Sequence, residues 1–262
     1  MKNTLPIFSL FCLLTLQLFS CKDYDGGDEQ TVPTVCTDVH WTYEGDEGPA
    51  HWDDLCLGFN ACAGASQSPV NIEQSTPNAN LASILKNYHS SSVHILNNGH
   101  TEQFNYDGGS SIVFGGETYD LLQFHFHTPS EHRVNGISYP MEVHLVHKNA
   151  ATGKLAVIGI LFEEGAENEL LKKFTAHLPA NKDEKYEAAD TYDVADLLPS
   201  SDGYYTYAGS LTTPPCSEIV TWLVLKNHVI ASVEQIHKIE EYEHENNRPI
   251  QDLHGRTVWS FN

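Results

Sequence analysis

The run "LLQFHFHTPSEH", residues 121–132, constrains the fold more than any other part of the sequence. Successive side chains of a β-strand point to opposite faces of its sheet. A strand here therefore gives one face to a set that contains both histidines and the other face to an apolar set. The first set is Gln123, His125 and His127, and the second is Leu122, Phe124 and Phe126. We expect a sheet with one apolar face and one face that carries imidazoles.

A second run, "PMEVHLVHK" at residues 140–148, repeats this alternation. It puts Glu142 and His144 on one face, opposite Val143 and Leu145. If the two strands are neighbours, three imidazoles converge, and three neutral histidines that leave a fourth position open are typical of catalytic zinc. Because the chain has 15 histidines, a His-x-His pair alone is a weak signal. The two runs together predict a zinc site.

Two further side chains strengthen this prediction. Gln123 can accept a hydrogen bond from the second ring nitrogen of His125, and Glu142 can accept one from that of His144. Such partners fix the tautomer of a metal-binding histidine and raise its basicity.

Most of the remaining chain has strand character. Short runs rich in Val, Ile, Phe and Tyr, separated by Gly, Asn or Asp turns, occupy residues 92–99, 102–108, 111–127, 141–148, 155–163 and 219–226. Helical patterns are fewer and occupy residues 168–178 and 232–245. Ser232 and Gln235 form a capping-box pattern at the start of the second helix. The fold class that we expect is mainly β, of the α+β kind, with one large sheet.

Composition narrows the classes of partner. The chain has 262 residues, of which 40% are apolar, and this suffices for a substantial core. It carries 35 Asp and Glu against 14 Lys and Arg, a formal net charge of −21. This charge opposes binding to a polyanion, so we expect no nucleic-acid partner. No break in composition and no internal repeat divides residues 39–262, which we interpret as one domain.

The N-terminus has the pattern of an export signal. Lys2 precedes the apolar run "LPIFSLFCLLTLQLF", which is short for a membrane span, and we interpret residues 1–20 as a signal peptide. The run ends in "LFSC", which resembles a bacterial lipobox, so Cys21 is the predicted lipidation site. Residues 21–38 are acidic and poor in apolar residues, so we expect a tether beyond the lipidated cysteine. Secretion after simple cleavage is the alternative.

Cysteine parity agrees with export. Five cysteines remain after removal of residues 1–20, and four if Cys21 carries a lipid. An even number in an exported protein indicates two disulfides, since the compartment is oxidising.

Several long motifs resemble those of the alpha-class carbonic anhydrases, in that family's order: "HWTYEGDEGPAHW", "QSPVNI", "ILNNGH", "QFHFHTPSEH", "MEVHLVHK" and "GSLTTPPCSEIVTW". The resemblance covers residues 39–262. It implies a large central, mostly antiparallel, twisted sheet with a few peripheral helices. It also implies zinc as the cofactor and the reversible hydration of carbon dioxide to bicarbonate and a proton, through attack of a zinc-bound hydroxide.

The resemblance assigns roles by motif. The zinc ligands are His125, His127 and His144, and their outer partners include Gln123 and Glu142. The family's remaining outer partner is a main-chain carbonyl, which we expect at about Gly255. Thr212 matches the residue that accepts a hydrogen bond from zinc-bound hydroxide and donates its own proton to Glu131. The carboxylate acceptor leaves a threonine lone pair for the hydroxide and so orients it.

Other motif positions match the walls of the family's cavity. The apolar pocket for carbon dioxide corresponds to Val146, Val157, Leu211, Val220 and Trp222, each of which also fits plain core packing. The bicarbonate position corresponds to Thr213, and the polar, water-ordering side to Tyr43, Asn98 and Gln103. His100 matches the proton shuttle, a task suited to an imidazole that titrates near 6.5, and His94 is the nearest alternative.

In exported members of the family the disulfide corresponds to Cys62–Cys216, which leaves Cys36 with Cys56. We expect the protein in the periplasm or at the outer membrane or cell surface of a Gram-negative bacterium, as a lipoprotein whose only membrane contact is its anchor. The expected partners are carbon dioxide and bicarbonate, and a homodimer is left open.

Two other functions compete with hydration. A catalytically weak, carbonic-anhydrase-like module for binding or adhesion would show a substituted ligand, yet the three histidines, Glu131 and Thr212 are all present. A zinc esterase would need an acyl-binding groove, for which the sequence has no signal. Thr128 stands where many animal enzymes of the family have tryptophan, and we expect this to affect only the packing below the site.

Overall fold

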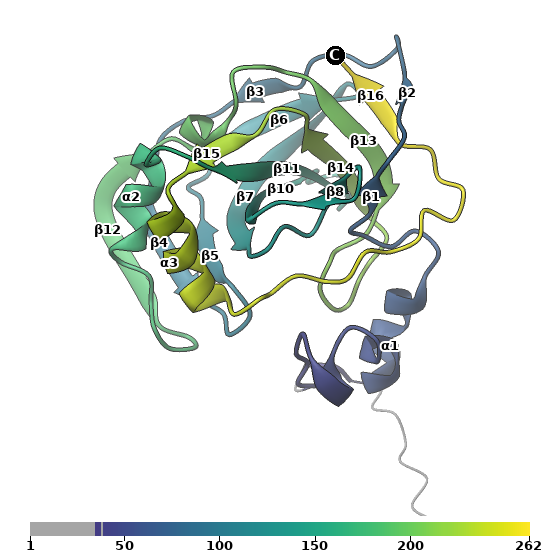
Figure 1. The fold of residues 1–262 in the computed structure, drawn as a ribbon, viewed down its shortest axis with the longest axis horizontal. Coiled ribbons are helices and arrows are strands. Elements are labelled where there is room, and N and C mark those ends of the chain that lie inside the picture. Colours follow the sequence, from purple (N-terminus) through teal and green to yellow (C-terminus); the bar gives the residue numbers. More distant parts are fainter. Residues whose placement is uncertain (1–34, 38) are drawn as a thin grey trace, which may run out of the picture. The chain divides into compact units, whose positions relative to one another are not determined.

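The computed structural model describes residues 35–37 and 39–262. The predicted signal peptide, the predicted lipidation site Cys21 and most of the predicted tether lie outside these residues. Strands outnumber helices in the described chain, which confirms the mainly β fold predicted from the sequence (Figure 1).

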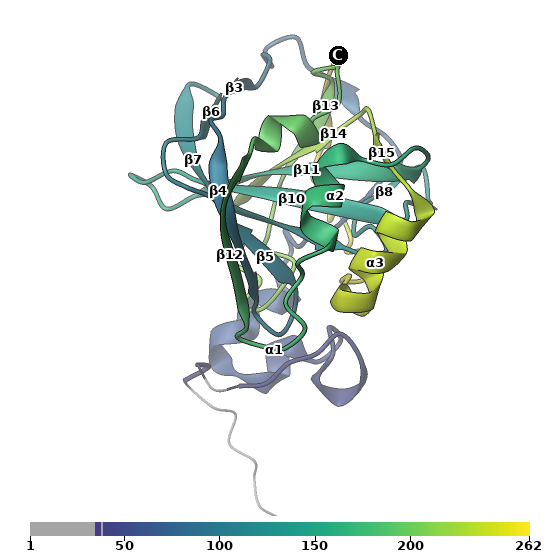
Figure 2. The ribbon, with the colours of Figure 1, turned by 90° about the vertical axis from the view of Figure 1, so that its left-hand side faces the viewer.

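A sheet of 13 strands dominates the structure. Its centre consists of β7 (Glu117–His127), β10 (Met141–Lys148), β11 (Leu155–Glu164) and β14 (Val220–Leu225), in that order. β7, β10 and β11 pair antiparallel, whereas β11 and β14 pair parallel. Most of the other pairings are antiparallel, as expected, and the whole sheet is twisted (Figures 1 and 2).

The remaining strands flank this centre. The order continues on one side with β5 (Glu102–Asn105), β4 (Ser91–Asn97) and β12 (Lys185–Tyr192), and on the other with β13 (Tyr204–Gly209), β16 (Trp259–Phe261) and β2 (Thr76–Pro77). Beside this path lie β3 (Leu85–Asn87), β6 (Ser111–Phe114) and β15 (Val229–Ala231). A separate small sheet contains β1 (Asn71–Ile72), β8 (Arg133–Val134) and β9 (Ile137–Ser138).

Both predicted helices are present. They are α2 (Glu169–Thr175) and α3 (Val233–Glu243), and Figure 2 shows them on the same side of the sheet. α3 begins with the predicted capping box, in which Ser232 and Gln235 each bind the other's main-chain N–H. The other helical elements are α1 (Trp52–Leu55) and the 3₁₀ turns Gly45–Glu47, Leu57–Ala63 and Val194–Leu197.

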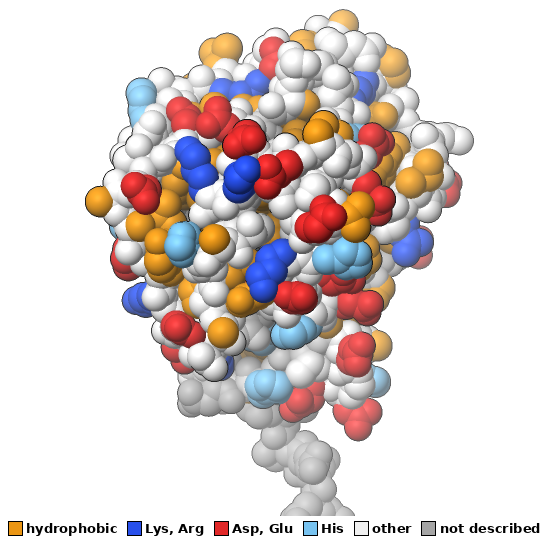
Figure 3. Space-filling model, turned by 60° about the vertical axis from the view of Figure 1, so that its left-hand side comes forward, with side chains coloured by type: hydrophobic (Ala, Val, Ile, Leu, Met, Phe, Trp, Pro, Cys, Tyr) orange, Lys and Arg blue, Asp and Glu red, His pale blue; other side chains and the backbone are white. Residues whose placement is uncertain are grey.

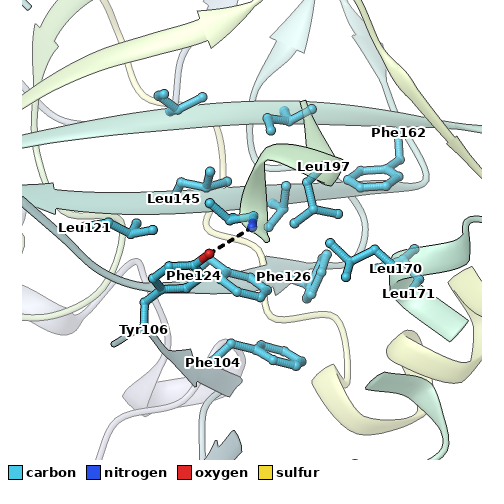
Figure 4. Close-up of a cluster of buried hydrophobic side chains, with 14 of the residues drawn as sticks. Phe104, Tyr106, Leu121, Phe124, Phe126, Leu145, Phe162, Leu170, Leu171 and Leu197 are labelled. Carbon is cyan, nitrogen blue, oxygen red and sulfur yellow. Dashed lines mark hydrogen bonds between the residues drawn. The ribbon is translucent and has the colours of Figure 1, made fainter. Parts of the chain in front are cut away.

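The larger hydrophobic core lies on the sheet face that these helices cover (Figure 4). Phe124 and Phe126 of β7 point into it, as the alternation predicts, and pack with Phe104 of β5. Leu170 and Phe174 contribute from α2. This face of β7 is therefore committed to packing, and its histidines lie on the opposite face.

The prediction of an apolar, buried face is wrong for one residue of β7. Leu122 is 44% exposed. The register between β7 and β10 shifts at this point, since Val146 pairs with Gln123 while His147 pairs with Leu121. Leu122 therefore lies in a bulge without a partner on β10, and Leu121 joins the core in its place.

The surface carries the acidic excess of the sequence. Figure 3 shows Asp and Glu side chains spread over one face of the molecule, between scattered Lys and Arg side chains. Among the described residues, no helix has the length and apolar character needed to cross a membrane.

Candidate metal centre

The three predicted histidines converge because β7 and β10 are neighbours. Their antiparallel register sets His144 directly opposite His125, and Glu142 opposite His127. One ring nitrogen from each histidine lies within 4.8 Å of the corresponding nitrogen of the other two. The alternation in two separate runs of sequence thus builds one cluster on the sheet face away from α2 and α3.

The outer hydrogen bonds determine which nitrogen of each ring is left for a ligand. Nδ1 of His125 lies 2.9 Å from Oε1 of Gln123, and Nε2 of His144 lies 2.9 Å from Oε1 of Glu142. Both partners are the ones expected from the sequence. The ring nitrogens that remain for a ligand are Nε2 of His125 and Nδ1 of His144.

The third outer partner was predicted at the wrong residue. Nδ1 of His127 lies 2.8 Å from the main-chain oxygen of Asn246, not from that of Gly255. α3 ends at Glu243, and a sharp turn there brings Asn246 to the end of β7. Because only a main-chain atom is used, the side-chain sequence gave no direct signal for this partner.

The cluster fits a divalent metal that prefers nitrogen ligands. Nε2 of His127 is buried and has no hydrogen-bond partner within the described chain. Burial lowers the pKa of His127 to about 4 and lowers the pKa values of His125 and His144 as well. The rings are therefore neutral near pH 7, and neutral imidazole is the form that binds zinc.

Glu131 lies beside the cluster. Its Oε2 is 3.6 Å from Nε2 of His127, and its Oε1 accepts a hydrogen bond from the main-chain N–H of Arg248 at 2.8 Å. Burial raises the pKa of Glu131 to about 7, while His144, the Arg248 N–H and a hydrogen bond with Thr212 oppose this rise. The contact between Thr212 and Glu131 that the sequence predicted is thus present.

The predicted apolar pocket residues form one cluster. Four are buried in a second hydrophobic core and the fifth packs against it. They are Val146, Val157, Val220 and Trp222, with Leu211 at the edge. The ring of Trp222 lies 4.7 Å from that of His144. Thr213 accepts a hydrogen bond from the N–H of Cys216 in the loop that carries Thr212.

The residues predicted for the polar, water-ordering part of the site lie close to the turn that carries His100. Nδ2 of Asn98 lies 3.5 Å from Oε1 of Gln103, and Oδ1 of Asn98 accepts from the main-chain N–H of His100 at 2.9 Å. The ring of His100 stacks on Trp41. Tyr43 and His100 line a surface cavity of about 1160 Å³.

His94, the alternative shuttle, is instead bound to the carboxylates of Asp107 and Glu187.

Three buried residues near the site were missed by sequence reasoning. Nδ1 of His132 lies 2.7 Å from Oε1 of Glu142, so two histidines share this carboxylate. The guanidinium of Arg248 donates to the oxygens of Gln67, Ser68 and Cys62. Asn246 and Arg248 both belong to "ENNRP". This polar run at the end of the predicted helix was a signal for the segment, but not for the atom that His127 contacts.

Both disulfides are present in the pairing that was expected. Cys62 bonds to Cys216 across 154 residues, and Cys36 bonds to Cys56 across 20 residues. The first bond holds the loop of Thr212 next to the 3₁₀ turn Leu57–Ala63.

Comparisons with known proteins agree with this geometry. The family model for eukaryotic-type carbonic anhydrase matches residues 47–262. A carbonic anhydrase of Pectobacterium atrosepticum is 46% identical over 222 residues, which cover 84% of this chain and 90% of the relative.

Solved structures are similar over the same region. The alpha-carbonic anhydrase of Thermovibrio ammonificans, in complex with the inhibitor sulfanilamide, is 42% identical with a TM-score of 0.81, covering 84% of this chain and 99% of its own. A hyperthermostable carbonic anhydrase identified from an active hydrothermal vent chimney is 43% identical with a TM-score of 0.82, covering 85% of this chain and 100% of its own.

Proposed function

The chain belongs to the eukaryotic-type, or alpha, carbonic anhydrase family, and from that premise we propose that its reaction centre is the cluster of His125, His127 and His144. The reaction is the reversible hydration of carbon dioxide to bicarbonate and a proton. The observation that supports the proposal most directly is the set of three outer hydrogen bonds, which leave one nitrogen of each ring within 4.8 Å of those of the other two.

We propose zinc as the metal at this point. Three neutral imidazoles suit zinc with an open position, and the unpartnered Nε2 of His127 needs a ligand in place of a hydrogen bond. When bound, zinc supplies a Lewis acid that lets a water ionise near neutral pH. The carboxylates of Glu142 and Glu131 would offset the positive charge of the ion.

The surrounding side chains orient and separate the reactants. The Glu131 carboxylate accepts a hydrogen bond from the hydroxyl of Thr212, so a threonine lone pair is free to accept a hydrogen bond from the attacking oxygen. Carbon dioxide is uncharged, so it would lie against the apolar cluster that includes Val146 and Trp222. Thr213 would contact bicarbonate, and His100 would carry the released proton to solvent.

The competing function is binding without catalysis. Stopped-flow hydration of carbon dioxide by the purified domain, with its metal content measured before and after chelation, distinguishes the two. We expect about one zinc per chain, fast hydration, and loss of the activity when the metal is removed. Stoichiometric zinc without hydration would instead support a binding module.

The two disulfides indicate an oxidising compartment, and therefore an exported protein. We further propose that Cys21 is lipidated and anchors the domain to the outer membrane, on the basis of the lipobox-like "LFSC" and the acidic tether. Detergent partitioning of wild type and Cys21→Ser tests this. The wild type should enter the detergent phase and the variant should not, and an aqueous wild type would support simple secretion.

A further inference from the structure

Glu243, the last residue of α3, is a buried carboxyl group without a role in the reaction described above. Its exposed fraction is 3%. Burial and the neighbouring carboxyl group of Glu102 raise the pKa of Glu243 well above its usual range. Burying a carboxyl group costs free energy unless hydrogen bonds compensate, so the contacts of Glu243 indicate why it is there.

The first contact leads to the metal centre. Oε2 of Glu243 accepts a hydrogen bond from Nδ2 of Asn246 at 2.7 Å. Asn246 accepts from Nδ1 of His127 at 2.8 Å through its main-chain oxygen, and from the N–H of Thr128 at 3.1 Å through Oδ1. Its Nδ2 also donates to the main-chain oxygen of Phe126 at 2.9 Å. Asn246 therefore contacts three consecutive residues at the end of β7, and Glu243 holds Asn246.

The second contact leads to the turn that carries His100. Oε1 of Glu243 accepts from the main-chain N–H of Glu102 at 3.1 Å. The side chain of Thr101 also hydrogen-bonds to Glu243. Thr101 and Glu102 directly follow His100, so the same carboxyl group fixes the start of β5.

The chain between Glu243 and Asn246 is strained. His244 and Glu245 have φ angles of 52° and 55°. Residues other than glycine adopt this left-handed region at a cost in free energy, and they remain there only where the surroundings fix them. The hydrogen bond between Glu243 and Asn246 closes this turn and thereby opposes its relaxation.

We propose that Glu243 is a positioning residue for the metal centre: through Asn246 it holds His127 in its metal-binding orientation, and through Glu102 it anchors the turn of His100. The metal part of this inference rests on the proposed function, because it takes the three histidines to bind zinc. One carboxyl group at the end of α3 then connects the ligand strand β7 with the shuttle turn.

The zinc dissociation constant, measured by chelator competition, tests the first connection. Glu243→Ala removes both acceptors and should raise the constant about 10-fold, the lower range for an outer partner of a ligand. Glu243→Gln has a single acceptor oxygen and should raise it less. Glu240→Gln is the matched control, because the side chain of this residue on the same helix pairs with His237 at the surface, and it should leave the constant unchanged.

A double-mutant cycle distinguishes positioning from general destabilisation. Asn246→Ala keeps the main-chain oxygen but loses the side-chain clamp. If Glu243 acts through Asn246, Glu243→Gln should weaken zinc binding in the wild-type background and cause no further loss in the Asn246→Ala background. Equal losses in both backgrounds overturn the proposal. If Glu243→Ala fails to fold, Glu243→Gln alone decides.

Hydrogen exchange tests the second connection without activity. The amide of Glu102 should exchange about 10-fold faster in Glu243→Ala than in wild type, because its acceptor is gone, whereas Glu240→Gln should leave it unchanged. An unchanged zinc constant and an unchanged Glu102 amide in the Glu243 variants reject the inference. A wild type that binds no zinc at the histidines rejects the proposed function instead, and the exchange result still stands.

Discussion

The imidazole of His100 lies flat on the indole of Trp41, with ring centroids 3.6 Å apart and planes 7° from parallel. In this position, burial lowers the pKa of His100 to about 4, and the charges of Lys182 and His40 contribute to the same shift. The stacked ring is therefore neutral near pH 7, and we expect protonation to favour release of the ring from Trp41 into solvent. A shuttle that titrates near neutral pH requires this movement.

A proton titration of His100 by NMR checks this relationship. We expect an apparent pKa between about 4, the stacked value, and about 6.5, the value for a solvated ring. Trp41→Ala removes the stacking partner and should move the pKa towards the upper value. A value that does not change in this variant would show that stacking does not control the titration.

His100→Ala should lower kcat several-fold in dilute buffer, because product water must lose its proton through a slower route. The ratio kcat/KM should stay nearly constant, since the hydration step is untouched. Added imidazole should restore kcat. If the His100→Ala variant keeps the kcat of wild type in dilute buffer, another group carries the proton.

His127→Ala should release the metal and abolish hydration. The variant loses one of the three imidazoles, and the two that remain bind zinc more weakly than three. The main core lies on the other face of β7, so the circular dichroism spectrum should remain close to that of wild type. Full zinc content with full activity in this variant would contradict the assignment of the ligands.

Replacing both Cys62 and Cys216 by serine should reduce the free energy of unfolding by about 5 kcal/mol in the loop-entropy model. The bond closes a long loop, because its cysteines are separated by 154 positions in the sequence. The matched control replaces Cys36 and Cys56, whose separation is 20, and should lose less. Urea unfolding of both variants measures the difference, and a larger loss in the control would contradict the loop argument.

His147 should make stability fall as the pH is lowered. The ring is buried between the hydroxyl of Tyr88, 2.9 Å from Nε2, and the main-chain oxygen of Ala156, 3.2 Å from Nδ1. Burial lowers its pKa to about 4, below the value of about 6.5 in the unfolded chain. Between these two values the unfolded state binds more protons than the folded state. The contribution of His147 to the free energy of unfolding is therefore complete above about pH 6.5 and is lost as the pH falls towards 4.

The size of this loss follows from the same two values. At pH 4 it amounts to about 3 kcal/mol. Urea unfolding of wild type and His147→Gln at several pH values gives the measurement, and the curve of the variant should be flatter in this window. Parallel curves would show that other groups cause the pH dependence.

The sequence alone determined the histidine pair and its strand. Side chains alternate with a period of two along any strand, so His125 and His127 share a face wherever that strand lies in the fold. The same local rule gave Glu142 and His144, and the motifs that resemble a known family gave their common site. The capping box at Ser232 was likewise predictable, because it needs only four consecutive residues.

The tertiary structure decided what depends on distant parts of the chain. The bulge at Leu122 arises from the pairing of β7 with β10, which no alternation within β7 can reveal. The partner of His127 is a main-chain oxygen 119 residues away, and every residue has such an oxygen, so the side-chain sequence cannot single out Asn246. Only the end of α3 and the strained turn after Glu243 bring that oxygen to the end of β7.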